Sequence, residues 1–487
     1  MLGSASGRSQ ETPEDIELSH LGSPTSQNEE RRILRNFFVM SVLFSSNHGT
    51  VVSCVSLATA RLGSVGALQV GVMYLSYTLS ALLGASYVVR RLGSRNAMIF
   101  GMALYSSYVA CFVVATSSLE IERAIALSES GLRIRSTAAI AAILGGLGAG
   151  FLWVAQGTYF AQAAKLHANA LSQDISDSTS YMAGIFGFVM LSTEAFLRAL
   201  SSLLVYFMDW KAIFATYTAI AMVTTVAMLL VQNYPKVEEP NSPNTFLYKV
   251  TAAIRLIFRD RKMIYLVGLN AMFGFGGAFM NSYVNGEVLA VALQDYDSHY
   301  VGIFSSWTAL IACLLSLFTT TFMRRKGPVV IAGILSFFFV ALPFLIQPDA
   351  MEWDMSGIVT IYTLQGIGRS SFETTLKAIF ADYFSSDPVG AFSNLILQNG
   401  IANSMGYFFT YHLNCEIPGK YCVLYTDNSL HDVRTFPLII CISGCLALLG
   451  YWRATILFKR EQEFRRSELA VSENVELSLR NATVEYI

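Results

Sequence analysis

The chain has 487 residues, of which 53% are hydrophobic and only 14% are Asp, Glu, Lys or Arg. Soluble domains carry about 25% charged residues, so this composition excludes a set of soluble domains and excludes disorder over most of the chain. The net charge of −1 provides no basic surface for nucleic acids. The composition therefore indicates a protein whose solvent is the lipid bilayer.

Runs of about 20 mostly apolar residues, the length that crosses the hydrocarbon core, occur along the whole chain. Their spacing predicts an all-α membrane protein with twelve transmembrane helices. The approximate limits are 34–58, 67–89, 97–117, 137–162, 180–207, 212–231, 263–283, 300–322, 329–347, 356–381, 390–412 and 435–457.

The distribution of Lys and Arg predicts the orientation, because basic residues are retained on the cytoplasmic side. Most of the 33 lie in segments that are cytoplasmic if both termini are inside. The first 32 residues lack an apolar stretch typical of a cleavable signal peptide, so the first span is expected to insert as a signal anchor. The predicted organisation is a disordered cytoplasmic tail (1–33), a six-helix half (34–231), a cytoplasmic linker (232–262), a second six-helix half (263–457) and a cytoplasmic tail (458–487).

The linker carries apolar residues at helical spacing beside Lys249, Arg255 and Arg259. This pattern is typical of an amphipathic helix on the inner membrane surface, and a basic linker without fixed structure is the alternative. In the outside loop before the last span, Cys415 and Cys422 are candidates for a disulfide. The other five cysteines lie in apolar runs and are expected to be buried. No paired zinc-type spacing occurs, so neither a metal nor a cofactor is expected.

Short motifs narrow the fold family. Residues 90–95 read Arg-Arg-Leu-Gly-Ser-Arg, and residues 324–327 read Arg-Arg-Lys-Gly. Both resemble the signature loop of the major facilitator superfamily, although Arg90 stands where that loop has an Asp. Residues 145–159, a Gly-rich segment followed by Leu-Trp and Gln-Gly-Thr-Tyr, resemble the uncoordinated-ninety-three family, a divergent branch of that superfamily. These glycines also have a purely structural interpretation, since small residues let helices approach closely.

The resemblance implies two pseudo-symmetric six-helix halves around a polar cavity, with spans 1, 4, 7 and 10 facing the cavity and spans 3, 6, 9 and 12 facing lipid. The polar residues follow this division, because the central portions of spans 3, 6, 9 and 12 contain no charged, His or amide side chain. Such side chains concentrate in the predicted cavity helices and include Asn47, His48, Gln156, Asn270, Arg369, Glu373 and Lys377. Polar groups at membrane depth are costly and typically functional.

In span 10, Arg369, Glu373 and Lys377 recur every four residues and share one helical face. This stripe suits an anionic or zwitterionic ligand or a gate between the halves, and a self-neutralising ladder that fixes helix packing is the alternative. Glu194 and Arg198 form a second pair with the same spacing, either for coupling or for structure. The unperturbed pKa of a histidine would let His48 respond to endosomal acidification, and a packing role is the alternative.

Two functions follow from these patterns. The first is transport of a small solute or ion by alternating access through the polar cavity. The second, implied by the family resemblance, is regulation or trafficking of an ion channel or receptor. No P-loop or hydrolase motif occurs, so the chain is not expected to be an enzyme. The partners are the lipid bilayer, a solute, and in the second case another membrane protein; plasma and endolysosomal membranes both remain open.

Overall fold

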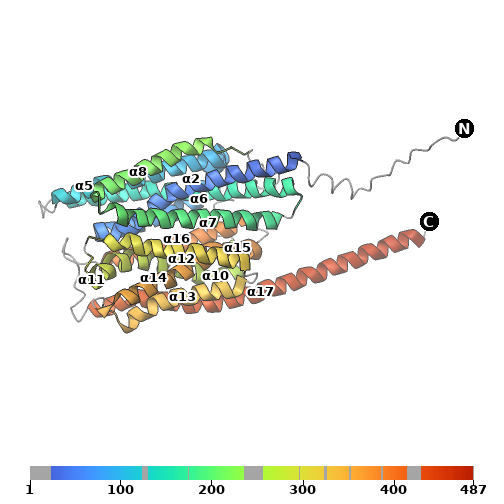
Figure 1. Cartoon of the computed structure of the whole chain (residues 1–487). Coiled ribbons are helices and arrows are strands. Elements are labelled where there is room, and N and C mark those ends of the chain that lie inside the picture. Colours follow the sequence, from blue (N-terminus) through green and yellow to red (C-terminus); the bar gives the residue numbers. More distant parts are fainter. Residues whose placement is uncertain are drawn as a thin grey trace.

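The described residues of the computed structural model are helical, with short turns between the helices and no strand among them. They cover 24–122, 130–173, 175–234, 256–295, 297–322, 326–349, 352–384, 388–413 and 429–485. The long helices run side by side along one axis, and the first described residue, Pro24, begins a helix at the same end of the bundle at which the last described residue, Glu485, ends one (Figure 1). We call this the terminal end of the bundle. The prediction of an all-α membrane protein is confirmed.

The first half of the chain forms one group of helices. Their bounds are α2 (Pro24–Leu62), α3 (Ser64–Leu83), α4 (Ala85–Leu92), α5 (Ser94–Glu122), α6 (Ser130–Leu171), α7 (Ile175–Leu204), α8 (Trp210–Ala227) and the short η1 (Met228–Leu230). Asp209 caps α8, because its carboxylate accepts a hydrogen bond from the Ala212 N–H at 2.9 Å.

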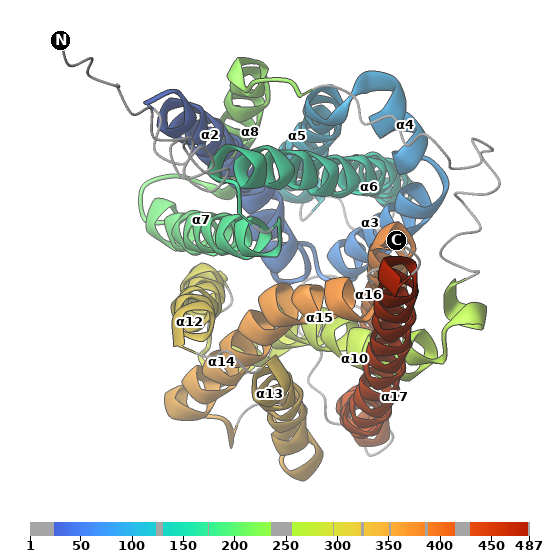
Figure 2. The same cartoon turned by 90° about the vertical axis from the view of Figure 1, so that its right-hand side faces the viewer.

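The second half forms the other group. Its bounds are α10 (Arg261–Ala278), the π-helical η2 (Phe279–Val288), α11 (Leu289–Ala292), α12 (His299–Phe322), α13 (Lys326–Ile346), α14 (Met355–Ser370), the π-helical η4 (Ser371–Thr375), α15 (Leu376–Tyr383), α16 (Pro388–Leu413) and α17 (Ser429–Glu485). Viewed from the terminal end, the two groups occupy opposite sides of the bundle (Figure 2).

Ten of the described helices are long and apolar enough to cross a membrane. The other two predicted spans, 356–381 and 390–412, are helical as well, in the run from α14 to α15 and in α16. Their composition is more polar, because the first carries Arg369, Glu373 and Lys377 and the second carries a stripe of amides. The count of twelve stays a prediction.

The first and last of the long helices, α2 and α17, extend beyond the predicted spans. α2 begins at Pro24, so residues 24–33 are helical and the prediction of disorder up to residue 33 is wrong there. α17 continues without a break from the last predicted span to Glu485 and projects past the bundle (Figure 1). Most of the predicted amphipathic linker helix, and both cysteines of the predicted disulfide, Cys415 and Cys422, lie outside the described residues.

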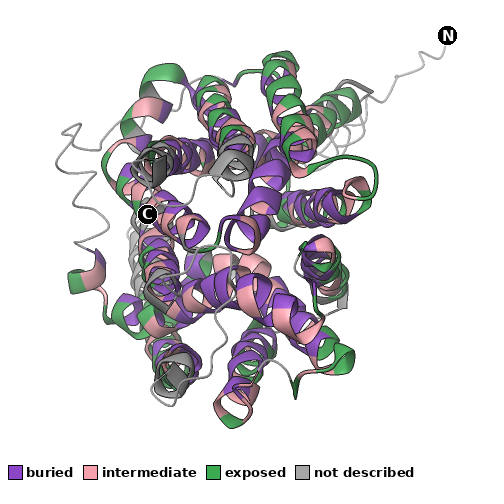
Figure 3. Cartoon of the chain, turned by 90° about the vertical axis from the view of Figure 1, so that its left-hand side faces the viewer, coloured by how far each residue is buried: buried purple, intermediate pink, exposed green. Residues whose placement is uncertain are grey.

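Buried residues face the interior of the bundle and exposed ones face outward, as Figure 3 shows from the end opposite the termini. The helices predicted to face lipid, α5, α8, α13 and α17, present exposed apolar side chains such as Phe100, Val223, Phe339 and Leu446. Cys445 on α17 is also exposed, so the expectation that it is buried is wrong. An outward side chain in a bilayer contacts lipid, and therefore it can be as apolar as a buried one.

The glycine-rich segment of α6 packs against two neighbouring helices. A methyl group at Gly146 would lie 2.3 Å from the Met73 carbonyl oxygen of α3, and one at Gly148 would lie 2.9 Å from the Gly101 carbonyl oxygen of α5. These are backbone atoms, which cannot easily move aside. The structural interpretation of the glycines therefore holds at both positions, because they allow three backbones to come close together.

Three pairs of helices illustrate the contacts between the two halves. A methyl group at Gly286 of η2 would lie 2.7 Å from Thr59 Cγ2 of α2, and one at Gly302 of α12 would lie 2.5 Å from the Arg198 carbonyl oxygen of α7. In the third pair, the Ser404 hydroxyl of α16 donates to the Gly71 carbonyl of α3 at 2.8 Å. The first two contacts lie in the part of the bundle away from the termini.

A single added methyl group should separate glycines that pack from glycines that do not. We expect Gly146→Ala to lower stability by about 1–3 kcal/mol, because the new Cβ would overlap the α3 backbone. Gly157→Ala, on the same helix, is the matched control, since no atom lies within 4 Å of the added methyl group. Thermal unfolding of both variants in mild detergent measures the difference. Equal melting temperatures would contradict the proposed close packing.

Candidate functional site

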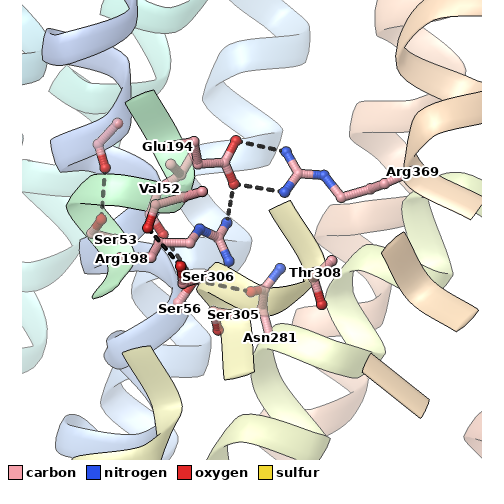
Figure 4. Close-up of polar contacts among 12 residues, drawn as sticks. Val52, Ser53, Ser56, Glu194, Arg198, Asn281, Ser305, Ser306, Thr308 and Arg369 are labelled. Atoms are coloured by element: carbon pink, nitrogen blue, oxygen red, sulfur yellow. Dashed lines mark hydrogen bonds and ion pairs between the residues drawn. The ribbon is translucent and has the colours of Figure 1, made fainter. Parts of the chain in front are cut away.

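The middle of the bundle contains an ion-pair network that joins the two halves (Figure 4). The Glu194 carboxylate of α7 accepts two hydrogen bonds from the Arg369 guanidinium of α14, at 2.6 Å from Nη1 and 2.7 Å from Nη2. Arg198, one turn further along α7, places its Nη2 2.7 Å from the same carboxylate. Glu194 is therefore bound by one cation from each half.

The fourth member of the network is Glu373, one turn after Arg369. Its Oε1 accepts a hydrogen bond from Arg369 Nε at 2.8 Å, so the spacing of four residues produces the ion pair predicted for this face. Arg369 occupies the last turn of α14, and Glu373 lies in the π-helical turn η4 that follows. π-Turns inside helices are frequent at functional sites, because they reposition side chains relative to a regular helix.

The charge network, defined as Glu194, Arg198, Arg369 and Glu373, is almost removed from solvent. The side chain of Glu194 is 1% exposed, and those of Arg369 and Glu373 are 13% exposed. Two carboxylates balance two guanidinium groups, which is how proteins retain ionised side chains at membrane depth. Two buried atoms, Arg198 Nε and Glu373 Oε2, have no hydrogen-bond partner within the described part of the chain.

Beside the network, His48 and Lys377 meet at the indole of Trp153. The His48 ring on α2 lies edge-on to the Trp153 ring of α6, with centroids 5.1 Å apart. Lys377, one turn beyond Glu373, places its Nζ 5.3 Å from the centroid of the same indole. This contact is a cation–π interaction between the two halves. His48 Nδ1 is buried and has no partner among the described residues.

The remaining predicted site residues form no hydrogen bond or ion pair with the charge network among the described residues. Asn270 of α10 donates to Gln398 of α16 at 2.6 Å, a contact within the second half. Gln156 of α6 is buried. Asn47 was expected to face the cavity, and this is wrong, because its amide donates to the Ala221 carbonyl of α8 at 3.0 Å. Asn47 directly precedes His48, and adjacent positions on a helix point in different directions.

Sequence reasoning missed several polar residues that join the halves. Asn285 of η2 donates to the Ser56 carbonyl of α2 at 3.2 Å and accepts a hydrogen bond from the Tyr362 hydroxyl. Asn281, one turn earlier, accepts from Ser56 Oγ at 3.3 Å. The signal was present, because Asn281 and Asn285 share one helical face, but the predicted seventh span ended at residue 283, which left Asn285 outside it, and Asn281 near its end was not singled out. Trp153 was noted only as part of a motif.

Removing the charge of Glu194 should leave Arg198 without a balancing carboxylate among the described residues and Arg369 with Glu373 as its remaining one. We expect Glu194→Gln to lower stability by roughly 3–5 kcal/mol, the usual effect of breaking a buried pair. Asp382→Asn is the matched control: its carboxylate lies 2.6 Å from Lys326 Nζ but is 47% exposed, so the expected change is about 0–1 kcal/mol. Thermal unfolding in detergent compares them, and similar small losses would show that the network does not stabilise the bundle.

Comparison with solved structures identifies the arrangement of helices. A mutant of the nucleoside transporter NupG matches with a TM-score of 0.59 and 14% identity over 86% of this chain and 99% of that chain. An auto-inhibited POT family peptide transporter matches with a TM-score of 0.61 and 12% identity over 86% and 97%. The xylose transporter XylE from E. coli, in a partially occluded inward open conformation, matches with a TM-score of 0.55 and 15% identity over 89% of this chain and 98% of that chain. At these identities the likeness establishes the fold.

Sequence comparison identifies the family. The chain is 22% identical over 430 residues to UNC93-like protein 3 of Arabidopsis thaliana, which covers 80% of this chain and 85% of the relative. The family model described as Major Facilitator Superfamily matches residues 37–408, which include the whole charge network. The signature loop and the span 4 segment therefore indicated the correct family. With this match over most of its length, the chain belongs to the major facilitator superfamily.

Proposed function

We propose that this protein moves a small solute across a membrane by alternating access, with the charge network as the element that both halves share. The observation that supports the proposal is the double hydrogen bond from Arg369 of the second half to Glu194 of the first. A carboxylate and a guanidinium at this depth separate only at high cost unless each keeps a second ion pair or a replacement for the lost partner binds. A bound solute can supply that replacement.

The contacts along the bundle support one conformation of such a cycle. Away from the terminal end, α2 packs on η2, and the Ser202 hydroxyl of α7 donates to the His299 carbonyl of α12 at 2.5 Å. Toward the terminal end, the contacts described for Asn36 and Tyr383 stay within one half: Asn36 bonds to Tyr159, and Tyr383 bonds to Thr455. If both termini are cytoplasmic, as the Lys and Arg distribution predicts, this arrangement corresponds to an inward-facing state.

The geometry of the network suits a contact that opens and closes as the two halves move relative to each other. Arg369 makes contacts in two directions, toward Glu194 across the interface and toward Glu373 on its own helix. Releasing Glu194 would leave Arg369 still paired with Glu373, and Glu194 still paired with Arg198. Each half therefore retains a local ion pair when the halves separate, so the interface contact can break without leaving either charge alone.

Uptake into liposomes tests this proposal with a mixture of solutes. The purified chain is reconstituted, incubated with a total metabolite extract, and the contents are analysed by mass spectrometry. We expect at least one small solute to accumulate above protein-free liposomes, and Arg369→Ala to abolish that accumulation because the contact with Glu194 is lost. Lys326→Ala is the matched control, since this cation belongs to the same half but its ion pair is exposed. Failure of every solute to accumulate, or equal uptake by Arg369→Ala, would refute the proposal.

A second function, regulation or trafficking of another membrane protein, is supported by a different part of the molecule. α17 has 57 residues and projects beyond the bundle, where it offers a long surface that transport does not require (Figure 1). Just before the projecting part, two contacts join α17 to the bundle. Lys262 forms an ion pair with Glu461, and the ring of Tyr383 stacks on that of Phe458 with their centroids 4.2 Å apart.

Shortening α17 separates the two functions. A chain that ends after Ser467 keeps both attachment contacts and removes most of the projecting helix. If the protein acts as a regulator, crosslinking in native membranes should capture a channel or receptor with the full chain and lose it with the shortened one. Solute uptake should be equal for both. Loss of uptake on shortening would instead assign the helix to the transport function.

A further inference from the structure

The charge network is balanced, and one cation in the centre of the bundle is not part of it. We propose that Lys377, His48 and Trp153 form a binding site for a small organic anion that carries one carboxylate and an apolar or aromatic body. The inference rests on the proposed transport function, because it names the class of solute that would occupy the shared centre.

The first observation is the position of the Lys377 ammonium group. Glu373 lies one turn before Lys377, yet its Oε1 binds Arg369, and no ion pair joins Glu373 to Lys377 among the described residues. The ammonium instead lies 5.3 Å from the centroid of Trp153. A cation–π contact is worth about 0.5–2 kcal/mol, less than a charge-assisted hydrogen bond to a carboxylate in a dry site. A carboxylate should therefore draw Lys377 away from the indole.

The second observation is the unpartnered nitrogen of His48. Its Nδ1 is buried and has no hydrogen-bond partner in the described part of the chain, and three aromatic rings lie close to the imidazole. The centroids of Phe44, Tyr105 and Trp153 lie 6.0, 6.0 and 5.1 Å from that of His48. A buried polar atom without a partner costs about 1–3 kcal/mol. With the proton on Nδ1, His48 would donate to a ligand oxygen that also binds Lys377.

The number of charges limits the ligand to a monoanion. Glu194 and Glu373 balance Arg198 and Arg369, so Lys377 contributes the single excess charge among the described residues of this region. A second negative charge on the ligand would have to compete with Glu194 or Glu373 for a guanidinium. Cationic ligands would be repelled by Lys377, since each carboxylate of the network already has a cation.

The surroundings of the indole favour an apolar body. Phe44 lies edge-on to Trp153 at 5.0 Å, and Phe186 lies 5.4 Å from Phe44. These rings belong to α2, α6 and α7 of the first half, whereas Lys377 belongs to α15 of the second. A ligand with its carboxylate on Lys377 and its body against the rings would contact both halves at once. Binding could then favour one relative arrangement of the halves over another.

Thermal stability of the full-length protein in detergent tests the site with three probes of similar shape. Benzoate, benzamide and benzylamine carry a negative, neutral and positive group on one ring. We expect millimolar benzoate to raise the melting temperature in a saturable way, and the other two probes to have no such effect. In K377M the apparent affinity for benzoate should fall about tenfold or more, because the charge-assisted contact is lost. K377R retains the charge and should retain benzoate binding.

Each result decides the inference. Equal stabilisation of K377M and the unaltered chain by benzoate would overturn it, as would stronger stabilisation by benzylamine or benzamide, or no stabilisation by benzoate. If K377M does not fold, K377R provides the comparison, and loss of benzoate selectivity there also counts against the site. Binding is measured at equilibrium, so benzoate binding without uptake of any solute would refute transport and leave the site intact. Uptake that is insensitive to K377M, with no benzoate binding, would refute the site alone.

Discussion

The carboxylate of Glu194 lies between two guanidinium groups in a region that excludes water, and the contact between the halves at mid-depth depends on it. Charges this far inside a bilayer protein are tolerated only when opposite charges satisfy them. Arg198 comes from the same helix as Glu194, whereas Arg369 comes from the other half of the chain. The Glu194–Arg198 ion pair therefore joins two turns of one helix, whereas the Glu194–Arg369 ion pair joins the two halves.

The packing around this centre follows the physics of lipid as a solvent. Helices in a bilayer gain little from hiding apolar side chains, because lipid tails are equally apolar, so close approach and polar contacts hold them together. α6 illustrates this point, since its glycines bring its backbone against α3 and α5. Where the halves meet, Gly286 and Gly302 have the same role, and amides such as Asn285 add hydrogen bonds.

The two proposed functions, solute transport and regulation of another membrane protein, involve different parts of the molecule. The charge network and the residues around Trp153 lie at the shared centre, where a solute would contact both halves. The projecting part of α17 lies outside the bundle and has no part in that centre (Figure 1). A protein of this fold could retain the first while using the second to bind another membrane protein. The two proposed functions therefore involve separate surfaces and do not compete for the same residues.

Composition and local patterns were sufficient to predict the membrane class, the family and the position of most helices. Span length and the spacing of Arg369 and Glu373 depend only on helix geometry, so they can be read from the chain. The sequence also indicated that Glu194 and Arg198 would be paired. It could not show that Arg369 binds Glu194, because 175 residues separate them and only the packing of α7 against the second half brings them together.

The same distinction explains the errors. Asn47 and His48 are neighbours in sequence, yet Asn47 bonds to α8 and His48 contacts Trp153, and only the rotation of α2 in the bundle decides this. Asn285 lay beyond the expected end of its span, because a helix can continue past the hydrocarbon limit that composition suggests. The sequence by itself determined which residues are costly to bury. The tertiary structure decided which of them satisfy one another, since that depends on distances across helices that are remote in the chain.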